Sequence, residues 1–175
     1  MKDSLLNVLM YTVPSLVVLA TAYLILRTFI DREVTKSRME LKLNNAKLIT
    51  PIRLQAYERL VLFLERITPE SLFIRIYKPG MTTELMHKSL LQIIRNEYEH
   101  NLSQQVYVSD DAWEAVKSAK ESILRLINTA ASSSRAKINA QEFSKLVMEA
   151  YNSVDGNPTE NAIGLIKAEI AEQIM

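Results

Sequence analysis

Residues 4–26 read SLLNVLMYTVPSLVVLATAYLIL, a run of 23 residues without a charged side chain. A helix rises about 1.5 Å per residue, so a run of this length reaches across a hydrocarbon core of about 30 Å. The sequence therefore predicts a transmembrane anchor within residues 1–30, and everything that follows is expected to be held at a membrane.

A cleaved signal peptide is the alternative interpretation of this segment. Ala20-Thr21-Ala22 resembles a signal peptidase site, and Lys2 supplies a basic start. The apolar core of a signal peptide is typically about 7–15 residues long, however. Because the apolar run continues through Leu26, the sequence favours an anchor.

Basic residues are concentrated directly after the apolar run. Residues 27–50 hold six basic side chains and three acidic ones. Anionic lipid headgroups attract such a segment, and the positive-inside rule places it in the cytoplasm. We therefore expect a single-pass membrane protein with its N-terminus outside and its domain cytoplasmic. The side chains expected at the lipid surface are Arg27, Arg32, Lys36 and Arg38.

The remaining residues, 51–175, have the composition of one helical domain. They carry 14 basic and 16 acidic residues, and such a balance does not favour nucleic acid as a partner. The chain has no cysteine, which excludes disulfides and thiol nucleophiles, and only three glycines and five prolines. About 125 residues suffice for a compact core without a metal or a disulfide.

Residues 31–50 are predicted to continue the anchor as a basic juxtamembrane helix that ends at Pro51. Val34, Leu41 and Leu48 repeat every seven residues, but Ser37 and Asn44 occupy companion positions. A sustained coiled coil needs three or four apolar heptads. The row is thus either a seam for a second copy or another partner, or the side of a helix that leans on its own domain, and the sequence slightly favours the second.

Helix-start signals divide residues 51–175 into a bundle of about five helices, so the fold class is all-α. Each signal places a capping side chain, a proline or acidic residues at the first turn. The starts are Thr68-Pro69, Thr82, Ser109-Asp110-Asp111, Asn139 with Glu142, and Asn157-Pro158.

Two Glu-x-x-His spacings raise the question of a metal centre. Glu84 precedes His87, and Glu97 precedes His100, on one predicted helix. Di-iron bundles bring such motifs together from different helices. Thirteen residues separate the two histidines here, which places them about 20 Å apart along the helix axis. We therefore expect no metal site and no cofactor.

Glu97 and Asn101 fall one turn apart inside the apolar arc of that helix. Buried polar groups are costly unless they are paired. One interpretation is structural: Glu97 pairs with Arg59 or Arg66, and Asn101 binds backbone. The other is a polar pocket built from these residues and their neighbours. Its members would be Glu97, Tyr98, His100, Asn101 and Tyr107. The structural interpretation is favoured.

Three stretches resemble a known family: RLQAYERLVLFLERI at residues 53–67, Pro79-Gly80-Met81, and NEYEHNLSQQVYVSDDAW at residues 96–113. The family comprises small single-pass inner-membrane helical proteins of Bacteroidota whose activity is uncharacterised. The resemblance covers most of residues 1–130. It implies an N-terminal anchor in the inner membrane of a bacterium with two membranes and a cytoplasmic helical domain. It carries no catalytic residue, cofactor or activity.

The function predicted from these patterns is that of a membrane-anchored adaptor or accessory subunit of a larger inner-membrane assembly, in export, envelope biogenesis or transport. It would act by protein–protein contacts, and we do not expect an enzyme, since the sequence holds neither a phosphate-binding glycine loop nor a nucleophile elbow. The alternative is a membrane-tethered enzyme or ligand sensor that uses a polar pocket around Glu97, His100 and Asn101.

Overall fold

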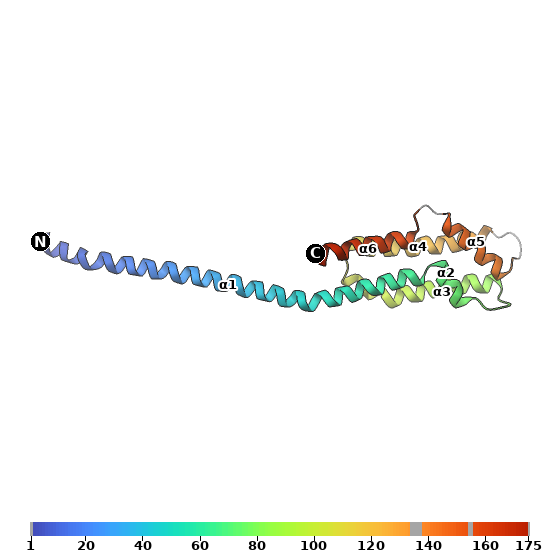
Figure 1. Ribbon diagram of the computed structural model, residues 1–175, viewed down its shortest axis with the longest axis horizontal. Helices are drawn as coiled ribbons and strands as arrows, with labels where there is room; N and C mark the ends of the chain where they lie inside the picture. The colour runs from blue at the N-terminus through green and yellow to red at the C-terminus, as the bar shows by residue number, and fades with distance from the viewer. Residues whose placement is uncertain (1, 134–137, 154–155, 175) are drawn as a thin grey trace. The chain divides into compact units, whose positions relative to one another are not determined.

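The protein is all-α, as the sequence predicts. The computed structural model describes residues 2–133, 138–153 and 156–174, and no strand occurs among them. Their helices, labelled in Figure 1, are α1 (Lys2–Arg66), α2 (Pro69–Ile76), α3 (Thr83–Asn101), the 3-10 helix η1 (Leu102–Val106), α4 (Asp110–Ser133), α5 (Ala140–Asn152) and α6 (Pro158–Ile174).

The chain divides into two compact units, Met1–Thr50 and Pro51–Met175. The prediction that helix ends at Pro51 is wrong, because α1 continues through this residue to Arg66. Proline removes one backbone hydrogen bond, here the one to the carbonyl of Lys47. Pro51 and Lys47 are both exposed, so water can solvate the carbonyl that proline leaves free.

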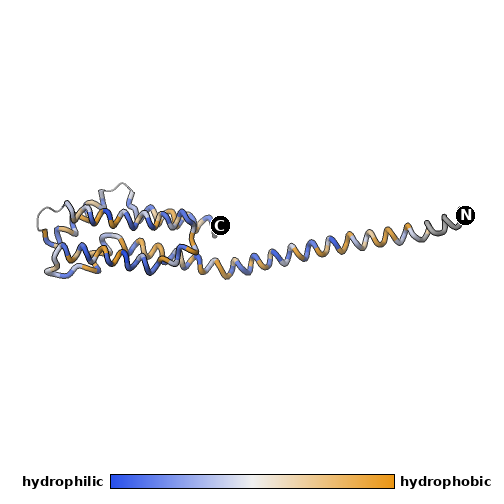
Figure 2. The backbone as a smooth tube through the Cα atoms, turned by 180° about the vertical axis from the view of Figure 1, so that it is seen from behind, coloured by the Kyte–Doolittle hydropathy of each residue, from blue (hydrophilic) through white to orange (hydrophobic). Residues whose placement is uncertain are grey.

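The first unit is a single helical segment whose apolar part is long enough, by length and composition, to cross a membrane. In Figure 2, the coloured part of this helix is mostly hydrophobic on the side of the N-terminus and alternates between hydrophilic and hydrophobic residues farther along. Hydroxyl groups in and beside the apolar run donate to carbonyls of the same helix: Thr21 to Val17 at 2.5 Å and Thr28 to Leu24 at 2.7 Å. Such internal bonds satisfy a hydroxyl where water is absent.

Side chains of the basic extension and of the heptad row are exposed within the first unit. Arg27, Arg32, Lys36 and Arg38 are exposed along α1. Val34, Leu41 and Leu48, the proposed seam, are exposed as well, and Leu48 has 69% of its surface accessible.

The second unit is a helical bundle built around the last turns of α1. Four residues of α1 and the residue that follows the helix are buried there, in one core with residues of all the later α-helices. They are Tyr57, Leu60, Phe63, Leu64 and, after the helix end, Ile67. Helix α4 contacts α3, α5 and α6, and the side chains along one face of it, from Trp113 to Ala130, are buried. Leu62 lies within a run of five apolar residues, Leu60–Leu64, yet half of its surface is exposed.

Side-chain caps fix where the helices of the bundle begin. The Thr82 hydroxyl accepts from the backbone N–H of Leu85 at 3.2 Å, and Asn139 with Glu142 forms the predicted capping box. The two caps are joined by a backbone bridge, and the Thr83 hydroxyl donates to the Ile138 carbonyl at 2.5 Å. The starts of α3 and α5 are therefore held together.

A buried pair of hydroxyl groups joins α5 and the first turn of α6. The hydroxyl of Tyr151 lies 2.7 Å from that of Thr159, and both residues are buried. Burial raises the pKa of the Tyr151 hydroxyl, because the phenolate would lose its hydration. The pair therefore satisfies two polar groups inside the bundle without a charge.

Candidate functional site

A pocket of ≈ 550 Å³ opens on the second unit between α1, α2 and α3. We call it the Glu97 pocket. Its polar lining includes three arginines and one carboxylate, and its apolar wall comes from α1 and α3. The lining residues are Arg59, Leu62, Phe63, Arg66, Arg75, Ile93, Asn96, Glu97, His100 and Asn101.

Glu97 holds two guanidinium groups, one on each carboxylate oxygen. Arg75 Nη2 lies 2.6 Å from Oε1, and Arg66 Nη1 lies 3.3 Å from Oε2. The Glu97 side chain is only 14% exposed, whereas those of Arg66 and Arg75 are 50% and 39% exposed. The carboxylate is thus nearly buried, and both arginines keep part of their surface toward solvent.

The partner that the sequence did not reveal is Arg75. It lies on the short helix α2, and a single arginine on an exposed helical face gives no signal of which distant carboxylate it meets. Its second nitrogen, Nη1, donates to the carbonyl of Arg66 at 3.4 Å. Arg75 therefore joins α2 to both α1 and α3.

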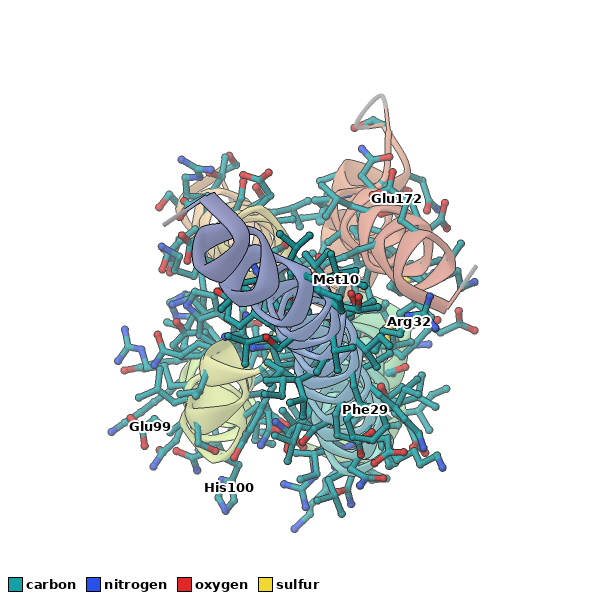
Figure 3. All side chains as sticks on the ribbon, turned by 90° about the vertical axis from the view of Figure 1, so that its left-hand side faces the viewer. Met10, Phe29, Arg32, Glu99, His100 and Glu172 are labelled. Atoms are coloured by element: carbon teal, nitrogen blue, oxygen red, sulfur yellow. The ribbon has the colours of Figure 1, made fainter. Side chains whose placement is uncertain are left out.

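The other predicted residues of the pocket occupy its wall and rim. Asn101 Nδ2 donates to the carbonyl of Glu97 at 2.8 Å, a contact with backbone. His100 is exposed, and its Nδ1 lies 2.7 Å from the carbonyl of Asn96. Figure 3 shows His100 and its neighbour Glu99 at the outer surface of α3. Arg59 lines the pocket and, within the described part of the chain, has no carboxylate partner.

Tyr98 and Tyr107 do not line the Glu97 pocket, contrary to the pocket interpretation. Consecutive residues of a helix are separated by about 100°, so Tyr98 belongs to the next face of α3. Its ring stacks on Trp113 with centroids 5.6 Å apart, and Lys120 Nζ lies 4.0 Å from the ring centroid. The carbonyl of Tyr107 accepts from Arg53 Nε at 2.9 Å.

A second polar network, which the sequence did not predict, surrounds Glu169 of α6. Its Oε2 accepts from the Ser109 hydroxyl at 2.5 Å, and its Oε1 accepts from the hydroxyl of Tyr57. Arg53 Nη2 lies 3.7 Å from the same oxygen. Since Ser109 also caps α4 through the N–H of Ala112, this network ties α1, α4 and α6 together.

The sequence did carry a signal for Glu169. It lies seven residues after Ala162 and three after Ile166, both buried, so the helical period places it on the core face of α6. A carboxylate on such a face requires donors. The sequence does not reveal which residues supply these donors, because they lie far from Glu169 along the chain.

Neither Glu-x-x-His motif forms a metal centre among the residues that the structure describes, and no group of three potential ligands occurs there. His87 Nε2 lies 2.8 Å from Asn128 Oδ1, and its ring meets Phe143 edge-on at 6.3 Å between centroids. His87 is therefore part of the contact between α3, α4 and α5.

Chemically, the Glu97 pocket is a cationic cleft with an apolar wall. Three arginines against one carboxylate give its lining a formal charge of +2, with histidine neutral. Arginine presents five N–H donors in a planar fork that matches carboxylate and phosphate oxygens. Glu97 binds one nitrogen of Arg66 and one of Arg75, so each of these arginines has further N–H donors that Glu97 does not use.

The chain belongs to a family that is described as a family of unknown function (DUF7935), which it matches over residues 3–173. No curated protein and no solved structure matches the chain.

Replacing Glu97 with Gln is expected to lower the free energy of unfolding by about 1–2 kcal/mol, because hydrogen bonds to a charged carboxylate contribute more than those to a neutral amide. The loss stays small because the partly exposed arginines can be hydrated in the variant. Urea denaturation of the full chain in detergent measures this loss. Glu99→Gln, an exposed site on the same helix, is the control and should leave stability unchanged. Equal stability of both variants would contradict a structural role for the Glu97 pairs.

Proposed function

We propose that the protein is a membrane-anchored adaptor or accessory subunit of a larger assembly in the inner membrane of a bacterium of the Bacteroidota, and that it serves export, envelope biogenesis or transport. It acts through protein–protein contacts. Support comes from the combination of an apolar segment of spanning length with a well-packed helical bundle that exposes apolar side chains.

The observation that carries this proposal is the apolar surface of η1. None of its residues is buried, although it connects two well-packed helices. Val106 is 76% exposed, and Leu102 and Tyr107, within four residues of it along the chain, are exposed as well. Apolar residues grouped on one short segment are typical of a surface that another protein covers. We name Leu102, Val106 and Tyr107 the η1 patch.

Topology is the second part of the proposal. The basic residues that follow the apolar run favour an N-terminus outside the cytoplasm and a cytoplasmic bundle, according to the positive-inside rule. Arg27, Arg32, Lys36 and Arg38 are exposed and can meet anionic headgroups at the membrane surface.

A ligand sensor or enzyme that uses the Glu97 pocket is the second candidate function. It is favoured by the pocket itself, which is large enough for a small molecule and which presents Glu97, His100 and Asn101 together. Such a role is compatible with an adaptor whose contacts depend on the ligand.

A homo-oligomer along Val34, Leu41 and Leu48 is a further form that the adaptor can take. If these residues make a parallel seam, Leu41→Cys forms a disulfide-linked dimer in membranes under mild oxidation, whereas Lys42→Cys, about 100° away on the helix, does not. Gel electrophoresis without reductant reads the result, since the chain has no other cysteine. Equal crosslinking of both variants, or of neither, would exclude the seam.

Val106→Asp is expected to remove the partner from the purified protein, because a charge on the η1 patch would be buried against an apolar surface. Affinity purification from native membranes in mild detergent, at natural abundance, is compared with Gln105→Asp, an exposed neighbour. The proposal requires partners that Val106→Asp loses and Gln105→Asp keeps. Identical recovery from both variants would exclude the η1 patch as the contact.

Asp3→Cys introduces the single cysteine of the chain and tests the topology. The residue should react with a membrane-impermeant maleimide once the outer membrane is permeabilised, while the inner membrane remains sealed. A cysteine at Glu99, on the exposed side of α3, should react only after the inner membrane is broken. The opposite pattern would overturn the proposed orientation.

A further inference from the structure

We propose that the Glu97 pocket binds the anionic group of a small molecule, a phosphate or a carboxylate, through Arg59, Arg66 and Arg75. This inference names the ligand class for the second candidate function above and rests on that candidate. It does not depend on the adaptor proposal or on the η1 patch.

The number of arginines is the first argument. One guanidinium suffices to neutralise Glu97, yet two contact it, at 2.6 Å and 3.3 Å, and a third lines the same cleft. Positive charges that lie close together repel one another, which raises the free energy of the folded protein. An anion in the cleft would balance the remaining formal charge of +2. It would also accept hydrogen bonds from the arginine N–H groups that Glu97 does not bind.

The burial pattern is the second argument. The Glu97 side chain is 14% exposed, while those of Arg66 and Arg75 remain 50% and 39% exposed. A buried carboxylate with a partly exposed arginine also occurs in the Glu169 network, where Glu169 is 12% and Arg53 34% exposed. What distinguishes Glu97 is that its two arginines line an open pocket. Glu97 fixes the orientation of the Arg66 and Arg75 guanidinium groups, so two of the cationic groups that line the pocket are preorganised.

The apolar wall is the third argument and concerns the rest of the ligand. Leu62, Phe63 and Ile93 line the pocket beside the arginines, and Leu62 is half exposed although it lies between buried residues of α1. A small organic anion can place its charge on the arginines and its carbon skeleton on this wall. A volume of ≈ 550 Å³ accommodates such a molecule.

Two sources share this chemistry: a dissolved metabolite and the headgroup of an anionic phospholipid. Glycerol phosphate is a probe for both, since it is soluble and also forms part of the phosphatidylglycerol headgroup. The experiment therefore uses the full chain in nanodiscs, made either of phosphatidylcholine alone or with phosphatidylglycerol added.

Calorimetric titration of glycerol phosphate into the phosphatidylcholine discs should give saturable binding that Arg59→Gln weakens by about tenfold, because a charge-assisted hydrogen bond is lost. Arg59 is chosen because it is outside the Glu97 pairs, so its loss leaves the bundle folded. Arg95→Gln, an equal change of charge at an exposed site of α3, is the matched control and should bind like wild type. Circular dichroism verifies that both variants remain folded.

Equal weakening by Arg59→Gln and Arg95→Gln would overturn the proposal, since it would indicate attraction by net charge alone. Saturable binding of glycerol or choline in place of glycerol phosphate would overturn the anionic class but retain a ligand pocket. The absence of saturable binding for all three probes would overturn the proposal and the second candidate function together.

Phosphatidylglycerol in the disc identifies the source. If the natural ligand is a headgroup, this lipid weakens the binding of dissolved glycerol phosphate to wild type and has no such effect on Arg59→Gln. If the ligand is a dissolved molecule, the lipid leaves the affinity of wild type unchanged. Both outcomes support an anion on the arginines.

Discussion

Burial of the last turns of α1 is the constraint on which the bundle depends. Tyr57, Leu60, Phe63, Leu64 and Ile67 are packed by the later helices, so the second unit cannot close its core without this segment. The same helix contributes Arg53 to the Glu169 network and Arg66 to the Glu97 pairs. Apolar burial supplies the driving force, and the two carboxylates fix which neighbours α1 meets.

The two carboxylate sites have different consequences for function. Glu169 is enclosed by Tyr57, Ser109 and Arg53, so its acceptors are used within the bundle. Glu97 is equally shielded, but its arginines border an open pocket. A structural pair and a binding site are therefore not exclusive at Glu97, because the pair that stabilises three helices also sets the arginine geometry.

Local signals in the sequence predicted the helix starts well, whereas contacts between residues far apart in the sequence could not be predicted. Thr82 and the pair of Asn139 with Glu142 act within one helical turn, so their positions alone determine the caps. The helix end predicted at Pro51 is wrong, because α1 continues through this residue. A proline is tolerated within a helix where water can solvate the carbonyl that it leaves without a hydrogen bond. Arg75 could not be assigned to Glu97, because which helices become neighbours is a property of the whole core.

The claim that this protein serves as one part of a larger assembly is tested most directly by its native size. Membranes that contain the chain at natural abundance are solubilised in mild detergent and resolved by native electrophoresis. The account predicts migration in a discrete assembly several times larger than the 20.0 kDa chain with its bound detergent. Migration of all the protein as a monomer in a single micelle would contradict it.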